Sequence, residues 1–113
     1  MRFGEQRMEI EEISVEELSK KVNAGEEFVL LDVRREDEHQ FVNIGGALIP
    51  LSELPNRLNE LDKSKEVIVY CRSGARSAAA TRILLDNGFE RVKNLKGGIL
   101  AWSDNIDPTK PKY

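Results

Sequence analysis

The stretch that organises this chain is Val67-Ile68-Val69-Tyr70-Cys71-Arg72-Ser73-Gly74-Ala75-Arg76-Ser77. Its apolar, β-branched start predicts a short buried strand. The strand ends at Cys71, the only cysteine among the 113 residues. A short loop with one glycine and two arginines follows, and an alanine-rich segment from Ser77 to Asn87 predicts a helix. A strand–loop–helix turn of this kind points backbone N–H groups and the positive end of a helix dipole at one place, here the Cys71 sulfur.

Such surroundings favour a cysteine thiolate over the thiol. We therefore predict that Cys71 is a catalytic nucleophile and that the loop after it is an anion cradle, made of Arg72, Ser73, Gly74, Ala75, Arg76 and Ser77. The alternative is a small buried residue at the end of a core strand, a common place for a free cysteine. An Arg-x-Gly-x-Arg loop disfavours this alternative, because an inert core cysteine does not need it.

The Cys71–Ser77 loop resembles the active-site loop of rhodanese-like sulfurtransferases. Three further motifs follow the family's order and extend the resemblance from Ile13 to the C-terminus: Leu31-Asp32-Val33-Arg34 with Glu38 following, Ile44-Gly45-Gly46-Ala47-Leu48-Ile49-Pro50-Leu51, and Asn94-Leu95-Lys96-Gly97-Gly98-Ile99-Leu100-Ala101-Trp102. The resemblance implies that a Cys71 persulfide carries sulfane sulfur from thiosulfate or a persulfide donor to cyanide, a thiol or a ubiquitin-like sulfur carrier. It implies no cofactor and no metal site.

Composition and charge set the broad class. Hydrophobic residues make up 40% and charged residues 33% of the chain, which is typical of one globular domain. A formal net charge of -3 gives no reason to expect a nucleic-acid partner. One cysteine cannot form an intramolecular disulfide, and the sequence shows no signal-peptide or membrane-length apolar stretch. We expect a cytoplasmic protein with no membrane partner.

The alternation of apolar and polar segments predicts an α/β fold. Residues 1–12 are expected to be a flexible lead-in or linker, and residues 13–113 a single rhodanese-like domain. Ser14 and Glu17 form a capping-box pattern, so a helix should follow and end at Gly25. The remaining elements expected are strands at 28–33, 48–49, 67–69 and 92–95, helical segments at 35–41, 52–61, 77–87 and 99–105, and a non-helical tail at 107–113.

Strands that alternate with helices predict a central, mostly parallel sheet of about five strands with helices on both faces. In such sheets the site lies at the carboxyl ends of the strands. Asp32, Arg34 and Cys71 all occupy such ends.

The resemblance also implies roles for charged residues near the loop. Arg34 would be the structural ion-pair partner of Glu38, and Asp32 would brace the active loop. Arg76 would belong to the fixed frame of the loop. The more exposed Arg72 would meet the incoming donor or partner.

Three other residues have simpler interpretations. His39 lies in a charged segment without a second histidine or a cysteine nearby, so we predict a surface residue rather than a metal ligand. Trp102 is predicted to be a core anchor near the sheet edge. Asn43 stands where many family members have histidine, and it can form hydrogen bonds but cannot relay protons near neutral pH.

Two other functions remain open. Cysteine phosphatases and arsenate reductases of related fold use a Cys-x5-Arg loop, usually with a histidine before the cysteine. This chain has Cys-x4-Arg from Cys71 to Arg76, preceded by Tyr70, which makes that chemistry the less favoured one.

The second possibility is a sulfur-relay or binding module with little activity on small donors. Residues 94–102 and 106–113 resemble the end of rhodanese domains fused behind the adenylyltransferases of molybdopterin and thiamine biosynthesis. In that setting the acceptor is the C-terminal glycine of a ubiquitin-like sulfur carrier. No adenylyltransferase domain occurs in these 113 residues, so the chain is either free-standing or a piece of a longer protein.

Overall fold

The computed structural model describes residues 9–113. Its centre is a five-stranded sheet with the strand order β1-β5-β4-β2-β3, and each neighbouring pair is parallel. The strands are β1 (Glu11–Ile13), β2 (Val29–Asp32), β3 (Ala47–Leu48), β4 (Val67–Tyr70) and β5 (Val92–Leu95). The predicted parallel α/β architecture is therefore confirmed.

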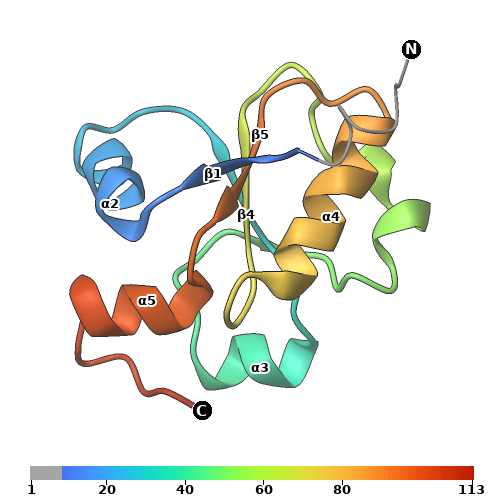
Figure 1. Ribbon diagram of the computed structural model, residues 1–113. Coiled ribbons are helices and arrows are strands. Elements are labelled where there is room, and N and C mark those ends of the chain that lie inside the picture. Colours follow the sequence, from blue (N-terminus) through green and yellow to red (C-terminus); the bar gives the residue numbers. More distant parts are fainter. Residues whose placement is uncertain (1–8) are drawn as a thin grey trace.

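Helices cover both faces of this sheet (Figure 1). They are α2 (Val15–Asn23), α3 (Glu36–Phe41), α4 (Ala75–Asp86) and α5 (Gly98–Asn105), with the short 3₁₀-helices η1 (Leu54–Asn56) and η2 (Leu58–Glu60). Helices α2 and α5 pack on one face, and α4 with η1 on the other. Trp102 of α5 packs against the apolar core on the α2 and α5 side of the sheet, as predicted for an anchor residue.

Strand β4 lies in the middle of the sheet, and all four of its residues are fully buried. Its side chains alternate between the two cores, because successive residues of a strand point to opposite faces. Val67 and Val69 face α4, and so does Cys71, whereas Ile68 and Tyr70 face α2 and α5. The alternation thus brings Cys71 to the side of the sheet on which α4 begins.

Helix α2 forms as its sequence predicts. The Ser14 hydroxyl accepts a hydrogen bond from the Glu17 amide at 3.0 Å, and the Ser14 amide donates to the Glu17 carboxylate at 2.9 Å. Gly25 follows the helix with φ +70°, the left-handed conformation that ends many helices.

Three differences from the predicted elements exceed one residue at an end. Helix α4 begins at Ala75 rather than at Ser77, so part of the loop belongs to its first turn. The prediction of one helix at 52–61 was wrong: the backbone leaves the helical conformation at Arg57, with φ -128° and ψ 19°, so two 3₁₀ turns form instead. Of the lead-in predicted at residues 1–12, residues 1–8 lie outside the described part, while Glu11 and Glu12 belong to β1.

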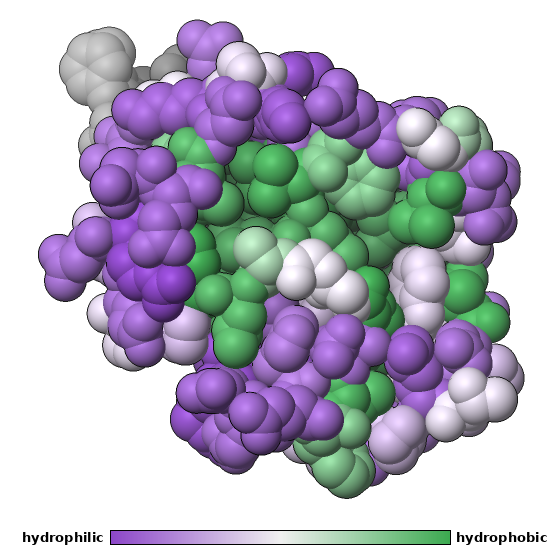
Figure 2. Space-filling view, turned by 180° about the vertical axis from the view of Figure 1, so that it is seen from behind, coloured by the Kyte–Doolittle hydropathy of each residue, from purple (hydrophilic) through white to green (hydrophobic). Residues whose placement is uncertain are grey.

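The surface is predominantly polar but not uniform. Figure 2 shows apolar residues gathered in the middle of the face opposite to that of Figure 1, with hydrophilic residues around them. The large apolar side chains that are most exposed in residues 9–113 are Val22, Phe41 and Tyr113. In the same range no helix is both long and apolar enough to cross a bilayer.

Candidate functional site

The cradle forms where β4 ends and α4 begins. The amide of Gly74 donates to the Cys71 sulfur at 3.1 Å, and the amide of Ser77 donates to it at 3.3 Å. Gly74 has φ +117° and stands immediately before α4. Backbone donors at a helix N-terminus stabilise an anion. The side chain that they surround is the Cys71 thiol, which is 1% exposed.

A buried polar pair lies next to the sulfur. The Ser77 hydroxyl is 3.3 Å from the Cys71 sulfur and donates to the Asn94 side-chain oxygen at 2.5 Å. The Asn94 amide donates in turn to the Gly74 carbonyl at 3.2 Å. Strand β5 thereby binds the cradle at Gly74 and at Ser77. Sequence reasoning placed Asn94 in a motif but did not identify it as a site residue.

Helix α5 holds the backbone of the loop from another side. The amide of Ile99 donates to the Cys71 carbonyl at 3.0 Å, and the amide of Leu100 donates to the Arg72 carbonyl at 3.1 Å. Gly98 has φ +61°, and a Cβ there would lie 2.4 Å from the Arg72 carbonyl oxygen. Glycine is needed at Gly98 because the backbone at the start of α5 approaches the backbone of the Cys71 loop this closely.

Asp32 and Arg34 form a buried ion pair at the end of β2. The guanidinium donates to both carboxylate oxygens, at 2.9 and 2.8 Å, and also to the Val42 carbonyl at 2.7 Å. Burial opposes the charge of Arg34 most strongly, yet the hydrogen bonds that it donates to Asp32 and Tyr113 raise its pKa above the ordinary value. The prediction that Arg34 pairs with Glu38 was wrong.

Glu38 pairs with Arg76 instead. The two guanidinium nitrogens lie 2.7 and 2.9 Å from its carboxylate oxygens, and the Arg35 amide donates to it at 3.0 Å. The hydrogen bonds from Arg76 are the main reason that the pKa of Glu38 falls to about 2. Arg34 bonds to Asp32, two residues before it at the same strand end, while α3 presents Glu38 to the first turn of α4.

The position of Asp32 also changes the expectation for His39. Nδ1 of His39 lies 2.8 Å from an Asp32 carboxylate oxygen, and the ring is only partly exposed. Asp32 therefore holds Arg34 and His39, and the contacts found for it do not reach the Cys71 loop. The prediction of a surface histidine was wrong, because the short helix α3 turns this residue inward.

Asn43 has a structural role in the turn before β3. Its side-chain oxygen accepts from the Gly45 amide at 2.8 Å, and its amide donates to the His39 carbonyl at 2.9 Å. The Tyr70 hydroxyl donates to the Gly45 carbonyl at 3.0 Å. The hydrogen-bonding role predicted for Asn43 is therefore present.

Tyr113 also reaches the site, although nothing in the sequence indicated it. Its hydroxyl accepts from Arg34 at 2.8 Å and donates to Glu38 at 2.8 Å. Its main-chain oxygen accepts from Nε of Arg72 at 2.7 Å. These partners are as many as 79 positions away in the chain, so no local pattern could connect them.

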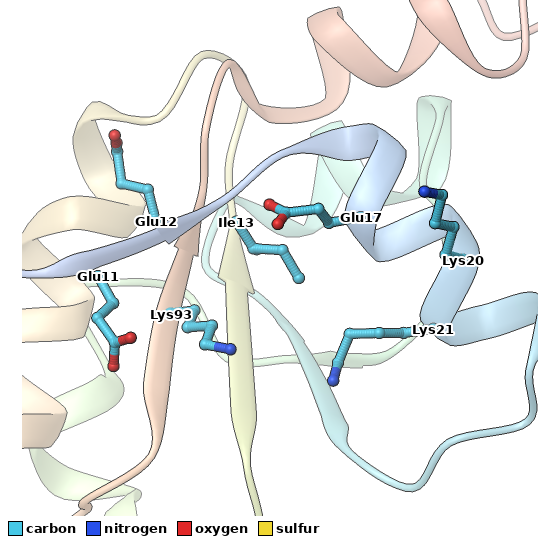
Figure 3. A pocket seen from close by; sticks show the side chains of 7 residues that line it. All are labelled: Glu11, Glu12, Ile13, Glu17, Lys20, Lys21 and Lys93. Atoms are coloured by element: carbon cyan, nitrogen blue, oxygen red, sulfur yellow. The ribbon is translucent and has the colours of Figure 1, made fainter.

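The surface hollows of residues 9–113 include two that are lined by charged side chains. One lies beside the cradle and is lined by Val33, Arg34, Arg35, Pro50, Leu51, Ser52 and Arg76. The other lies between β1, β5 and α2, and Figure 3 shows its mixture of carboxylates and ammonium groups. Two of those lysines, Lys21 and Lys93, already form ion pairs with Glu66. Within residues 9–113 no three His, Cys, Asp or Glu side chains are arranged to hold a metal ion.

Comparisons with known proteins agree with this geometry. The sequence model of the rhodanese-like domain family matches residues 14–105. A protein of Allochromatium vinosum named sulfurtransferase is 41% identical over 95 residues, which are 83% of this chain and 89% of that protein. The adenylyltransferase and sulfurtransferase MOCS3 of Arabidopsis thaliana is 36% identical over 118 aligned positions. That match covers 89% of this chain but only 25% of MOCS3.

The solved structures show the same fold. A rhodanese-like domain protein from Staphylococcus aureus superposes with a TM-score of 0.79 and 30% identity. The superposition covers 92% of this chain and 99% of that protein. The similarity in fold therefore extends over most of this chain.

Proposed function

This chain belongs to the rhodanese-like domain family, and on that basis we propose that it is a sulfurtransferase that works through a persulfide on Cys71. The observation that carries the proposal is the cradle, in which two backbone amides and a hydroxyl surround the sulfur of a single buried cysteine. A donor-lined cysteine sulfur at a helix N-terminus is suited to nucleophilic catalysis, because the anion is stabilised before and after the reaction.

The proposed reaction has two steps. The Cys71 thiolate attacks the outer sulfur of thiosulfate, the S–S bond of thiosulfate breaks, and sulfite leaves with the bonding electron pair. The product is Cys71–S–S⁻, whose negative charge lies within reach of the same loop amides. A nucleophile such as cyanide or a thiol then attacks the terminal sulfur, and the Cys71 thiolate leaves. A persulfide donor enters the first step in the same way, with a thiolate as the leaving group.

The arginines have different proposed duties. Arg76 is tied to Glu38 through two hydrogen bonds and supplies a fixed positive charge beside the loop. Arg72 is exposed, so it is the residue that an incoming anionic donor would meet first. Asp32 and Arg34 are proposed to support the site through their buried ion pair rather than to touch the substrate.

A protein acceptor is the second candidate for the sulfur. The similarity to MOCS3, which is named both adenylyltransferase and sulfurtransferase, supports this version. We propose that the acceptor in that case is the C-terminal glycine of a ubiquitin-like sulfur carrier. The loading of Cys71 is the same in both versions, but the second step differs. With the carrier, the terminal sulfur of the Cys71 persulfide attacks the carbonyl of the glycine activated as an acyl-adenylate, AMP leaves, and a thiol then cleaves the acyl disulfide to release the thiocarboxylate.

The test is intact mass spectrometry of the protein after incubation with thiosulfate, compared with the Cys71→Ser variant. The wild type should gain the mass of one sulfur atom, and cyanide or dithiothreitol should remove it. The serine variant should gain nothing. If the wild type takes up no sulfur from thiosulfate or from a persulfide donor, the proposed function is wrong.

A further inference from the structure

Arg72 is exposed, but one edge of its guanidinium is already occupied. Both Nε and Nη2 donate to the main-chain oxygen of Tyr113, the first at 2.7 Å. The guanidinium also lies over the Tyr113 ring, 5.2 Å from the ring centroid. The Nε–Nη2 edge of an arginine is one of the two that can bind an oxyanion with two parallel hydrogen bonds. The main-chain oxygen of Tyr113 therefore occupies the edge of Arg72 at which such an anion would bind.

Tyr113 is held in this place by contacts with two other elements. Its hydroxyl bridges Arg34 after β2 and Glu38 of α3, at 2.8 Å to each. Its ring meets the ring of Phe41 edge to face, with 6.0 Å between centroids. Phe41 is 58% exposed, so this ring contact lies at the surface of α3. Tyr113 is thus anchored independently of Arg72.

The other two arginines of the site have carboxylate partners. Arg34 is paired with Asp32, and Arg76 with Glu38. Among the contacts of residues 9–113, Arg72 has no ion pair with a carboxylate side chain, so it is the guanidinium best able to attract an oxyanion. An oxyanion that binds its Nε–Nη2 edge must first displace the Tyr113 oxygen, and this displacement weakens binding.

We propose that Tyr113 is a specificity-determining residue that disfavours small oxyanion donors at Arg72. The proposal rests on the proposed function, because it concerns which donors load Cys71. Thiosulfate carries sulfonate oxygens that compete with Tyr113 for Arg72. An alkyl persulfide without a carboxylate has no such oxygens, so its reaction with Cys71 does not require Tyr113 to move.

The experiment measures donor loading of Cys71 in two variants that release Tyr113. Tyr113→Ala removes the ring and the hydroxyl. Phe41→Ala removes one anchor and leaves the polar contacts of Arg34 and Glu38 in place. Val22→Ala, an exposed apolar truncation on α2, is the matched control. Each variant is first shown to be folded by circular dichroism and thermal unfolding, and Phe41→Ala decides the result if Tyr113→Ala does not fold.

The proposal predicts that the KM for thiosulfate falls by about threefold or more in Tyr113→Ala, and by a smaller factor in Phe41→Ala. The KM for a carboxylate-free alkyl persulfide should change in neither variant, and Val22→Ala should behave as wild type with both donors. A thiosulfate KM that is unchanged or raised in the folded variants overturns the proposal. An equal change with both donors also overturns it, because it would show a general effect on the loop.

A binding experiment separates this proposal from the proposed function. In the Cys71→Ser background, sulfite is titrated and the Arg72 Nε–H resonance is followed by NMR, with and without Tyr113→Ala. Tighter sulfite binding without the tyrosine supports the proposal even if the wild type transfers no sulfur. Equal or weaker binding contradicts it, whatever the sulfur-loading result.

Discussion

Gly98 is the single residue on which the shape of the Cys71 loop depends most directly. It has φ +61°, and a Cβ at this position would lie 2.4 Å from the Arg72 carbonyl oxygen and 2.6 Å from that of Cys71. These oxygens accept hydrogen bonds from the first turn of α5, so they cannot move away without breaking those bonds. Any side chain at this position would therefore displace the Cys71 loop from the first turn of α5.

We expect Gly98→Ala to destabilise the protein by more than about 2 kcal/mol and to reduce sulfur loading of Cys71 strongly. Urea unfolding and intact mass spectrometry measure the two effects. Gly25→Ala is the control, since Gly25 has φ +70° but a Cβ there would point into open space. That variant should lose about 1 kcal/mol and load sulfur normally. Equal losses in the two variants would mean that close approach to the loop is not the cause.

The ion pairs of the site could not be predicted from the charged residues taken one at a time. Asp32, Arg34, Glu38 and Arg76 were all identified as site residues from the sequence, but Arg34 was assigned to the wrong carboxylate. Two arginines and two acids permit alternative pairings of equal charge. Only the positions of the strand ends and of α3 decide between them.

At the scale of elements, the start of α2 could be predicted from neighbouring residues. The side chains of Ser14 and Glu17 accept hydrogen bonds from two backbone N–H groups at the start of the helix, as the sequence predicts. The 52–61 segment shows the opposite case. Its leucines have helical spacing, but the backbone leaves the helical conformation at Arg57 and two 3₁₀ turns form instead.

We expect Ser14→Ala to reduce the free energy of unfolding by about 1 kcal/mol, because an amide at the start of α2 loses its hydrogen-bond acceptor. The sulfur loading of Cys71 should be unchanged. Chemical denaturation measures the loss, with Glu16→Ala, an exposed change in the same turn, as the control. If Ser14→Ala costs no more than Glu16→Ala, the capping box does not stabilise this helix.

At the scale of the whole molecule, Glu38 joins segments that are distant in the chain. It lies on α3 and bonds to Arg76 at the start of α4 and to Tyr113, 75 positions away. Arg76 is the main cause of its low pKa of about 2, compared with an ordinary value of 4.5. A carboxylate with a lowered pKa stabilises the fold only while it is ionised.

This linkage predicts an acid-dependent loss of stability. The contribution of Glu38, as much as about 3 kcal/mol, should be complete above its ordinary pKa and lost as the pH falls from about 5 towards 2. Glu38→Gln should be less stable than wild type at pH 7 and should lose less stability over the acid range. Urea unfolding at several pH values measures the difference. Glu36→Gln on the same helix should keep the wild-type slope, and an unchanged slope in Glu38→Gln would contradict the prediction.

The sequence by itself determined the alternation of strands and helices, the parallel sheet and the loop around Cys71. These features depend on neighbouring residues: β-branched runs, caps, glycine turns and one motif of seven residues. Only the tertiary structure decided that Arg76 pairs with Glu38, that His39 meets Asp32, that Asn94 supports Ser77, and that Tyr113 covers Arg72. Three of these contacts join residues 17 or more positions apart, and the fourth, between His39 and Asp32, joins two different elements. Several partners of the same charge or polarity were available to each residue. Which of them meet depends on strand order and helix packing, and not on local pattern.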